Sequence, residues 1–163
     1  MLQKTTLPDF YVLGYEMITK NDALQQEGAE KTGLLMQKIP VLVPQLVENS
    51  KIIHYYTAYD AASVCDERTC FNQGIYNMGF GIQAHQPLVL QNGQVQRKIE
   101  AGNYLHAQMQ TTMQDMGKDT HAFWDKYIWI SEVFAQRSFV FDFVEYQTQN
   151  NQDFTVSFYI GIH

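Results

Sequence analysis

The sequence SFVFDFVEYQ (residues 138–147), followed by DFTVSFYIGIH (residues 153–163), predicts a closing pair of strands joined by a polar turn. Successive side chains of a strand point to opposite faces, so Phe143 and Glu145 share one face and Asp142 lies on the other. An acid therefore lies beside apolar groups on either face. Because burying an unpaired carboxylate is costly, we expect such an acid where a cation, a cluster of donors or water can reach it. The pattern indicates a site for a hydrophobic cation.

Composition limits the possible classes of protein. A chain of 163 residues is long enough for one domain with a core, so we expect a single domain over residues 1–163. The net charge of -6, with 11 Lys plus Arg and no basic cluster, argues against direct nucleic-acid binding. No apolar run approaches membrane-spanning length, and the N-terminus carries no signal-like apolar segment. We therefore expect a cytoplasmic protein that does not interact with membranes.

The same order of elements occurs twice along the chain, as strand, helix, strand, strand. Neither half could bury its apolar face well alone, so pairing them predicts an α+β fold built from a duplicated β-α-β-β repeat. Repeat one covers about residues 8–90 and repeat two about residues 91–163. The seam between the repeats is a natural place for a central cleft, flanked by the two helices. The expected strands are 9–17, 51–59, 71–84, 103–110 and those around Phe141 and Tyr159, and the expected helices are 28–49 and 119–131.

Local signals refine the helices and the cysteine loop. Asp119 or Thr120 is expected to cap the second helix, and prolines are expected to kink or split the first. Cys65 and Cys70 have no second cysteine pair and no histidine at zinc-site spacing nearby. We interpret them as two reduced thiols rather than a disulfide or a metal site. No metal or cofactor is expected.

Several stretches, in this order and spacing, resemble the GyrI-like (gyrase-inhibitor-like) small-molecule-binding domain, and the resemblance covers nearly the whole chain. This SHS2-like domain is also the effector-binding module of AraC-type and MerR-type bacterial regulators. Glu100, Ser131 and Gly161 stand where the family often has proline. The matching stretches are YNMGFGI (76–82), KIEAGNY (98–104), YIWIS (127–131), DFVEY (142–146) and FYIGI (158–162).

The resemblance implies a ligand and an acid that reads it. In regulator members of the family, a glutamate of the Asp-Phe-Glu-x-Tyr strand pairs with a lipophilic cationic effector. Counted without a gap, that position is Val144 here, while Asp142 shares its face and Glu145 points the other way unless a bulge intervenes. We favour Glu145 as the pocket acid and keep Asp142 as the alternative. A solvated acid near the end of the strand is the competing interpretation of Glu145.

Aromatic side chains are the other candidate ligand contacts. Trp129 matches the family tryptophan, although an aromatic stripe on a helix is more often part of a core. Tyrosines on strands around the seam combine an apolar ring with a hydroxyl that suits a half-wet cavity. The strand candidates are Tyr15, Tyr55, Tyr104, Phe143, Tyr146 and Tyr159.

Two other functions remain as alternatives. Some relatives of this fold hydrolyse reactive small molecules, so Glu145 with Tyr104 or Tyr146 could serve as base and electrostatic partner. Other family members inhibit a topoisomerase, which implies a protein-binding module. No nucleophile elbow, phosphate loop or metal-ligand spacing supports an enzyme, and no helix-turn-helix precedes the first strand. We expect a stand-alone sensor or sequestering module that binds lipophilic cations, either as a possible homodimer or beside a separate regulator protein.

Overall fold

A computed structural model shows the fold. The described residues are 2–20, 30, 34, 37–38, 51–58, 74–87, 89–91, 93–148 and 152–163. Most of the helix predicted over 28–49 and the whole loop that carries Cys65 and Cys70 lie outside this set, so these predictions stay untested.

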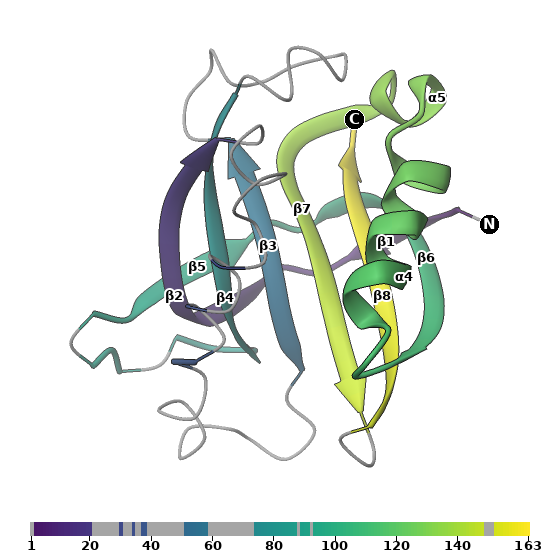
Figure 1. Cartoon of the computed structure of the whole chain (residues 1–163). Coiled ribbons are helices and arrows are strands. Elements are labelled where there is room, and N and C mark those ends of the chain that lie inside the picture. The colour runs from purple at the N-terminus through teal and green to yellow at the C-terminus, as the bar shows by residue number, and fades with distance from the viewer. Residues whose placement is uncertain are drawn as a thin grey trace.

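The described strands form one antiparallel sheet of eight strands, in the order β1-β6-β8-β7-β3-β4-β2-β5 (Figure 1). The order is symmetric about the β7–β3 pair, because each strand of one half has a counterpart at the same place in the other half. The predicted α+β class with duplicated strands is confirmed. The strands are β1 (Gln3–Leu7), β2 (Phe10–Lys20), β3 (Ile52–Ala58), β4 (Ile75–Ala84), β5 (Val95–Ile99), β6 (Gly102–Thr112), β7 (Arg137–Thr148) and β8 (Asp153–Ile162).

Two strands that the sequence did not predict, β1 and β5, join the halves. Each continues after two residues into a longer strand, β2 or β6, and each pairs with a strand of the opposite half. Leu7 lies opposite Gly102, and Phe10 lies opposite Ile99. In Figure 1 both connections cross behind the middle of the sheet, on the side away from α4. The face behind the sheet is therefore partly enclosed by backbone from both halves.

The second helical region is segmented. It comprises α4 (Met116–Phe123), a π-helical turn η3 (Trp124–Ile128) and the short α5 (Ser131–Phe134). The predicted cap at Asp119 or Thr120 is wrong, because the helix starts earlier and Asp115 is its N-cap residue. Asp119 instead accepts a hydrogen bond from the Thr111 hydroxyl at 2.7 Å, which ties the helix to β6. Within the described residues, no helix has the length and apolar character needed to cross a membrane.

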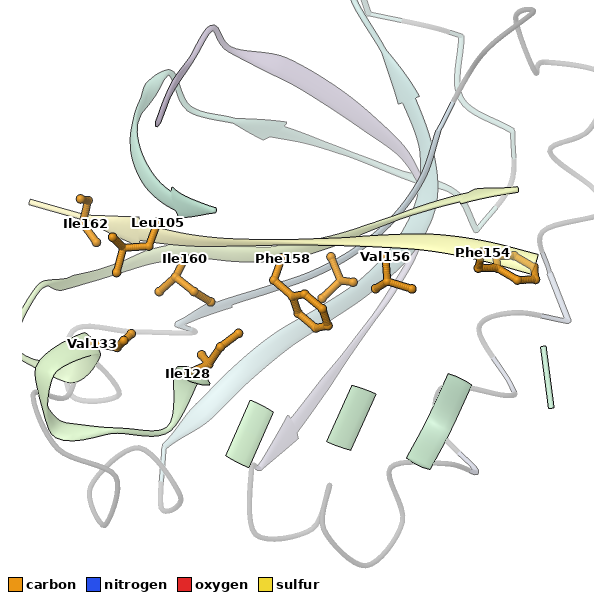
Figure 2. Close-up of a cluster of buried hydrophobic side chains, with 9 residues drawn as sticks. Leu105, Ile128, Val133, Phe154, Val156, Phe158, Ile160 and Ile162 are labelled. Carbon is orange, nitrogen blue, oxygen red and sulfur yellow. The ribbon is translucent and has the colours of Figure 1, made fainter. Parts of the chain in front are cut away.

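Buried side chains form separate clusters on the two faces of the sheet. The helix-face cluster packs β8 against the helices, and Figure 2 shows its β8 side chains pointing toward Ile128 and Val133. Val144 belongs to this cluster, and the Tyr146 ring extends the same face toward β4. Phe143, the residue directly before Val144, belongs to the pocket-face cluster on the opposite side of the sheet. That cluster contains Phe10, Val12, Ile53, Tyr55, Ile99, Tyr104, Phe141 and Phe143.

Candidate functional site

Strand β7 determines which side chains reach the site. Its pairing with β8 is shifted between Arg137 and Asp142, and from Asp142 onward the register is continuous. The bulge therefore lies before Asp142 rather than between Asp142 and Glu145. Regular alternation then sets Phe143 and Glu145 on the pocket face and Val144 on the helix face.

A pocket of about 110 Å³ opens on this face, at the seam between the halves. The link between β1 and β2 forms one wall, and the surface of β7 and β8 forms another. The ends of β3 and β4 complete it with polar side chains. The lining residues are Leu7, Pro8, Phe10, Lys51, Gln83, His85, Phe143, Glu145 and Tyr159.

A row of stacked rings crosses the sheet beside the pocket. Phe143 and Tyr159 are cross-strand neighbours whose rings stack at 4.5 Å, and His106 stacks on Tyr159 at 4.6 Å. The Phe10 ring meets Phe143 edge-on at 5.4 Å. Burial and the negative charge of Glu145 raise the pKa of Tyr159 to about 12, so its hydroxyl stays protonated at neutral pH. The row provides aromatic surface with one polar edge.

Glu145 is the buried acid of the pocket. Its side chain is only 9% exposed, and Oε1 lies 2.9 Å from Nζ of Lys51, whose side chain is 36% exposed. Glu145 lies opposite Ser157 of β8, two residues along from the Phe143–Tyr159 pair. The Ser157 hydroxyl accepts a hydrogen bond from the Gln108 amide at 3.0 Å. A carboxylate thus lies next to stacked rings, with the Lys51 ammonium group as a counter-ion.

Asp142, the alternative acid, is held inside the protein. Its carboxylate forms an ion pair with Arg137, whose side chain is fully buried, and accepts the Gly161 N–H at 3.2 Å. Burial raises the pKa of Asp142, while Arg137 and the Gly161 amide act in the opposite direction. Gly161 stands where the family often has proline, and a proline could not donate this bond. Asp142 fastens the bulged start of β7 to β8.

Comparison with known proteins assigns the chain to a family. Residues 5–162 match the Cass2 family, described as integron-associated effector binding proteins. The chain belongs to this family. No curated protein is significantly similar to it. The predicted GyrI-like recognition is confirmed, and the protein is an effector-binding domain, which makes a small molecule its expected class of partner.

Solved structures share the fold of this Cass2-family protein. An integron cassette protein from the mobile metagenome of Vibrio cholerae superposes with a TM-score of 0.72 at 20% identity, covering 99% of this chain and 95% of that one. The protein SAV2435, solved bound to tetraphenylphosphonium, superposes with a TM-score of 0.64 at 11% identity, covering 100% of this chain and 94% of that one. At these identities the likeness concerns the fold.

The predicted site residues fall into three groups. Glu145, Phe143 and Tyr159 line the pocket together. Tyr104 packs edge-on against both aromatic rings, at 5.6 Å from Phe143 and 6.4 Å from Tyr159, and its hydroxyl donates to the Glu100 carbonyl. Tyr104 therefore supports the Phe143 and Tyr159 rings of the pocket wall without lining the pocket itself.

The remaining candidates lie elsewhere. Trp129 packs against the helix-face cluster, and Tyr15 and Tyr146 lie on that same side of the sheet, away from the pocket. Tyr55 is on the pocket face, but its hydroxyl donates to Glu16 at 2.5 Å and Glu16 also pairs with Arg97. The Tyr55 hydroxyl is thus engaged in a separate, partly buried network.

Sequence reasoning missed several lining residues of the Cass2-family pocket. Lys51, Gln83 and His85 come from strand ends that carry no motif, and Leu7 and Pro8 come from the link after the unpredicted strand β1. A signal was available only for Lys51, as an isolated cation directly before an apolar strand. Its partner Glu145 is too distant in sequence for any spacing rule to connect the two residues.

Proposed function

We propose that this protein binds a hydrophobic organic cation in the pocket, with Glu145 as the counter-ion. The observation that carries the proposal is a carboxylate that is nearly buried among aromatic rings. Leaving such a charge without a cation would be strongly unfavourable, and a ligand that brings apolar surface and positive charge satisfies both the rings and the acid. SAV2435, which has the same fold, was solved with a lipophilic cation of this class.

Phe143 and Tyr159 would provide the apolar contact. A cation over an aromatic ring contributes about 0.5–2 kcal/mol, depending on how completely water is excluded. A charge-assisted contact with Glu145 contributes roughly 1.5–3 kcal/mol, and apolar burial adds to it. These contributions are compatible with micromolar affinity, which corresponds to about 8 kcal/mol.

The size of the pocket limits how the ligand would enter. Sites for drug-sized molecules usually measure about 300–1,000 Å³, whereas this pocket measures about 110 Å³. Part of a ligand, such as one ring or one charged group, fits without rearrangement. A larger cation requires the side chains at the pocket edge to move. The partly exposed Lys51 can move most easily, since long lysine side chains reach water at low cost.

Two ions of the same shape and opposite charge test the proposal. Tetraphenylphosphonium should bind the wild-type protein saturably in isothermal titration calorimetry, and tetraphenylborate should not. Glu145→Gln should weaken tetraphenylphosphonium binding about tenfold, because it removes the charge and keeps the size. Glu132→Gln, on the exposed surface of α5, changes the net charge equally and should have no effect beyond twofold. The proposal fails if no saturable binding occurs up to millimolar concentrations, or if the Glu145 variant binds like wild type.

The hydrolase alternative gains no support from the geometry. The Tyr104 hydroxyl is engaged with the Glu100 carbonyl at 2.8 Å, and the Tyr146 ring packs on the helix side of the sheet. Neither tyrosine is arranged as an electrostatic partner of Glu145. Binding without product formation is therefore the expected behaviour, and turnover of an ester that disappears in Glu145→Gln would contradict it.

A further inference from the structure

The pocket acid already has a cation of its own. Lys51 Nζ lies 2.9 Å from Glu145 Oε1, and both residues line the pocket. We propose that Lys51 is an internal competitor, which occupies Glu145 in the empty protein and must be displaced by the ligand. The inference rests on the proposed function and identifies the residue that sets its specificity.

The two partners differ in how far they can move. Glu145 lies within β7, paired with β3 on one side and β8 on the other, and its side chain is 9% exposed. Lys51 lies just before β3, where its backbone carbonyl accepts the Gln83 N–H at 2.8 Å. The Lys51 backbone is therefore fixed, while its 36% exposed side chain can swing into water. When an external cation arrives, lysine leaves and glutamate stays.

This exchange keeps the buried acid paired in both states. In the empty protein the ammonium of Lys51 neutralises it, and in the complex the ligand does. His106, stacked on Tyr159, is within reach of both charges. Burial has the largest effect and lowers the pKa of His106, while Glu145 raises this pKa and Lys51 lowers it. Both charges therefore act at the same place, next to the stacked rings.

Competition by Lys51 selects the chemical class of ligand. A small hydrophilic cation gains little by replacing an ammonium group that already sits at hydrogen-bond distance. A lipophilic cation also buries apolar surface against Phe143 and Tyr159, at roughly 25 cal/mol per Å². Lys51 thus sets a threshold of apolar area and excludes polar amines, which lack the surface to pass it.

Calorimetry with tetraphenylphosphonium tests the inference through a double-mutant cycle. Lys51→Met should tighten binding about tenfold, equivalent to about 1.4 kcal/mol. Lys118→Met, on the exposed surface of α4, changes the net charge identically and should stay within twofold of wild type. Lys51→Arg keeps the competing charge and should not tighten binding. In a Glu145→Gln background, Lys51→Met should have no effect, because no acid remains to compete for.

The possible results separate the two proposals. If wild type binds and depends on Glu145, but Lys51→Met binds no more tightly, the competitor inference is overturned while the proposed function stands. A gain that persists in the Glu145→Gln background also overturns it, since added apolar surface would then explain the effect. If no variant binds tetraphenylphosphonium, both proposals fail. Lys51→Gln removes the lysine charge without adding apolar surface, so it controls for that competing explanation. The thermal stability of each variant controls for misfolding.

An NMR titration of His106 gives a readout that needs no ligand. Lys51→Met should raise the His106 pKa, because the lysine charge that lowers it is gone. Glu145→Gln should lower it. An unchanged His106 pKa in both variants would show that the pair does not form next to Tyr159 and would overturn the inference.

Discussion

Replacing Arg137 with methionine tests whether Asp142 belongs to the fold or to the ligand site. The two side chains are 0% and 6% exposed, and they form an ion pair within the bulged start of β7. Removing one partner of a buried pair typically costs about 3–5 kcal/mol, because the other charge stays buried without compensation. For a chain of this length, each kcal/mol lowers the Tm by about 2–4 °C. Arg137→Met should therefore lower the Tm by roughly 10 °C, with the Gly161 N–H as a remaining donor to the acid.

Urea denaturation followed by the fluorescence of Trp124 and Trp129 measures the loss. Lys98→Met is the matched control, because Lys98 pairs with Asp9 and Glu100 on the exposed surface, where such pairs contribute little to stability. Adding Asp142→Leu to Arg137→Met should recover most of the stability, since an apolar pair carries no buried charge.

Two results would refute this reasoning. The first is a loss below about 1 kcal/mol in Arg137→Met, which would mean that water or another group compensates the acid. The second is Asp142→Asn that folds normally and yet loses cation binding, which would move the ligand charge from Glu145 to Asp142.

Two further predictions concern stability. Burial lowers the pKa of His54 from 6.5 to about 4. Between these pH values the unfolded chain therefore binds more protons than the folded protein. The free energy of unfolding should fall by up to about 3 kcal/mol as the pH drops from 6.5 to 4. His54→Phe, which keeps a ring beside Tyr56 and Phe80, should flatten this dependence in urea titrations, and an unchanged slope would contradict the assignment. Gly79→Ala should cost about 1–3 kcal/mol, because the new Cβ would overlap the Tyr55 ring. Gly117→Ala, with open space around it in α4, should instead stabilise by up to about 1 kcal/mol, and equal effects at the two glycines would refute the packing argument.

The predictable part of the fold was the part with local signals. Long strands such as β4 and β8 are rich in apolar and aromatic side chains, and both were expected. The strands β1 and β5 were missed because each has only five residues, mostly polar, and pairs with the opposite half of the chain. Pairing partners so distant in sequence leave no trace in a local pattern.

The site was predictable to the extent that strand alternation determines it. Alternation set Phe143 and Glu145 on one face, and the structure has them on the pocket face. Trp129 was expected at the pocket because the family tryptophan occupies that position, but its helix covers the other face of the sheet. The periodicity of a helix shows which side is buried, and it does not show which face of a sheet that side covers.

The symmetry of the fold explains why the pocket acid occurs in only one half. When the paired strands of the two halves are matched, Ile52 of β3 corresponds to Asp142 of β7. Tyr55 and Glu145 each lie three residues further along, so Tyr55 is the counterpart of Glu145. The Tyr55 hydroxyl donates to Glu16, whose carboxylate also binds Arg97, so a ring and an internal ion pair occupy this position in the first half. The matching pairs are Phe10–Ile99 with Gly102–Leu7, Tyr11–Ala84 with Asn103–Ile162, and Ile52–Ile82 with Asp142–Ile160.

Under the proposed function, this asymmetry would separate stability from ligand binding. In the first half, the acid Glu16 is paired with a guanidinium group and a tyrosine hydroxyl, at distances of 2.5–3.1 Å, so no group is left to exchange with a ligand. In the second half, Glu145 is paired among the described residues with the partly exposed Lys51, whose proposed displacement by a ligand would break no strand. Arg presents several donors in a fixed fork, whereas Lys is a flexible point charge, so the choice of cation decides which acid stays closed and which can open. If Glu145 binds the ligand as proposed, the duplicated fold holds one carboxylate in a fixed ion pair and leaves the other available to the ligand.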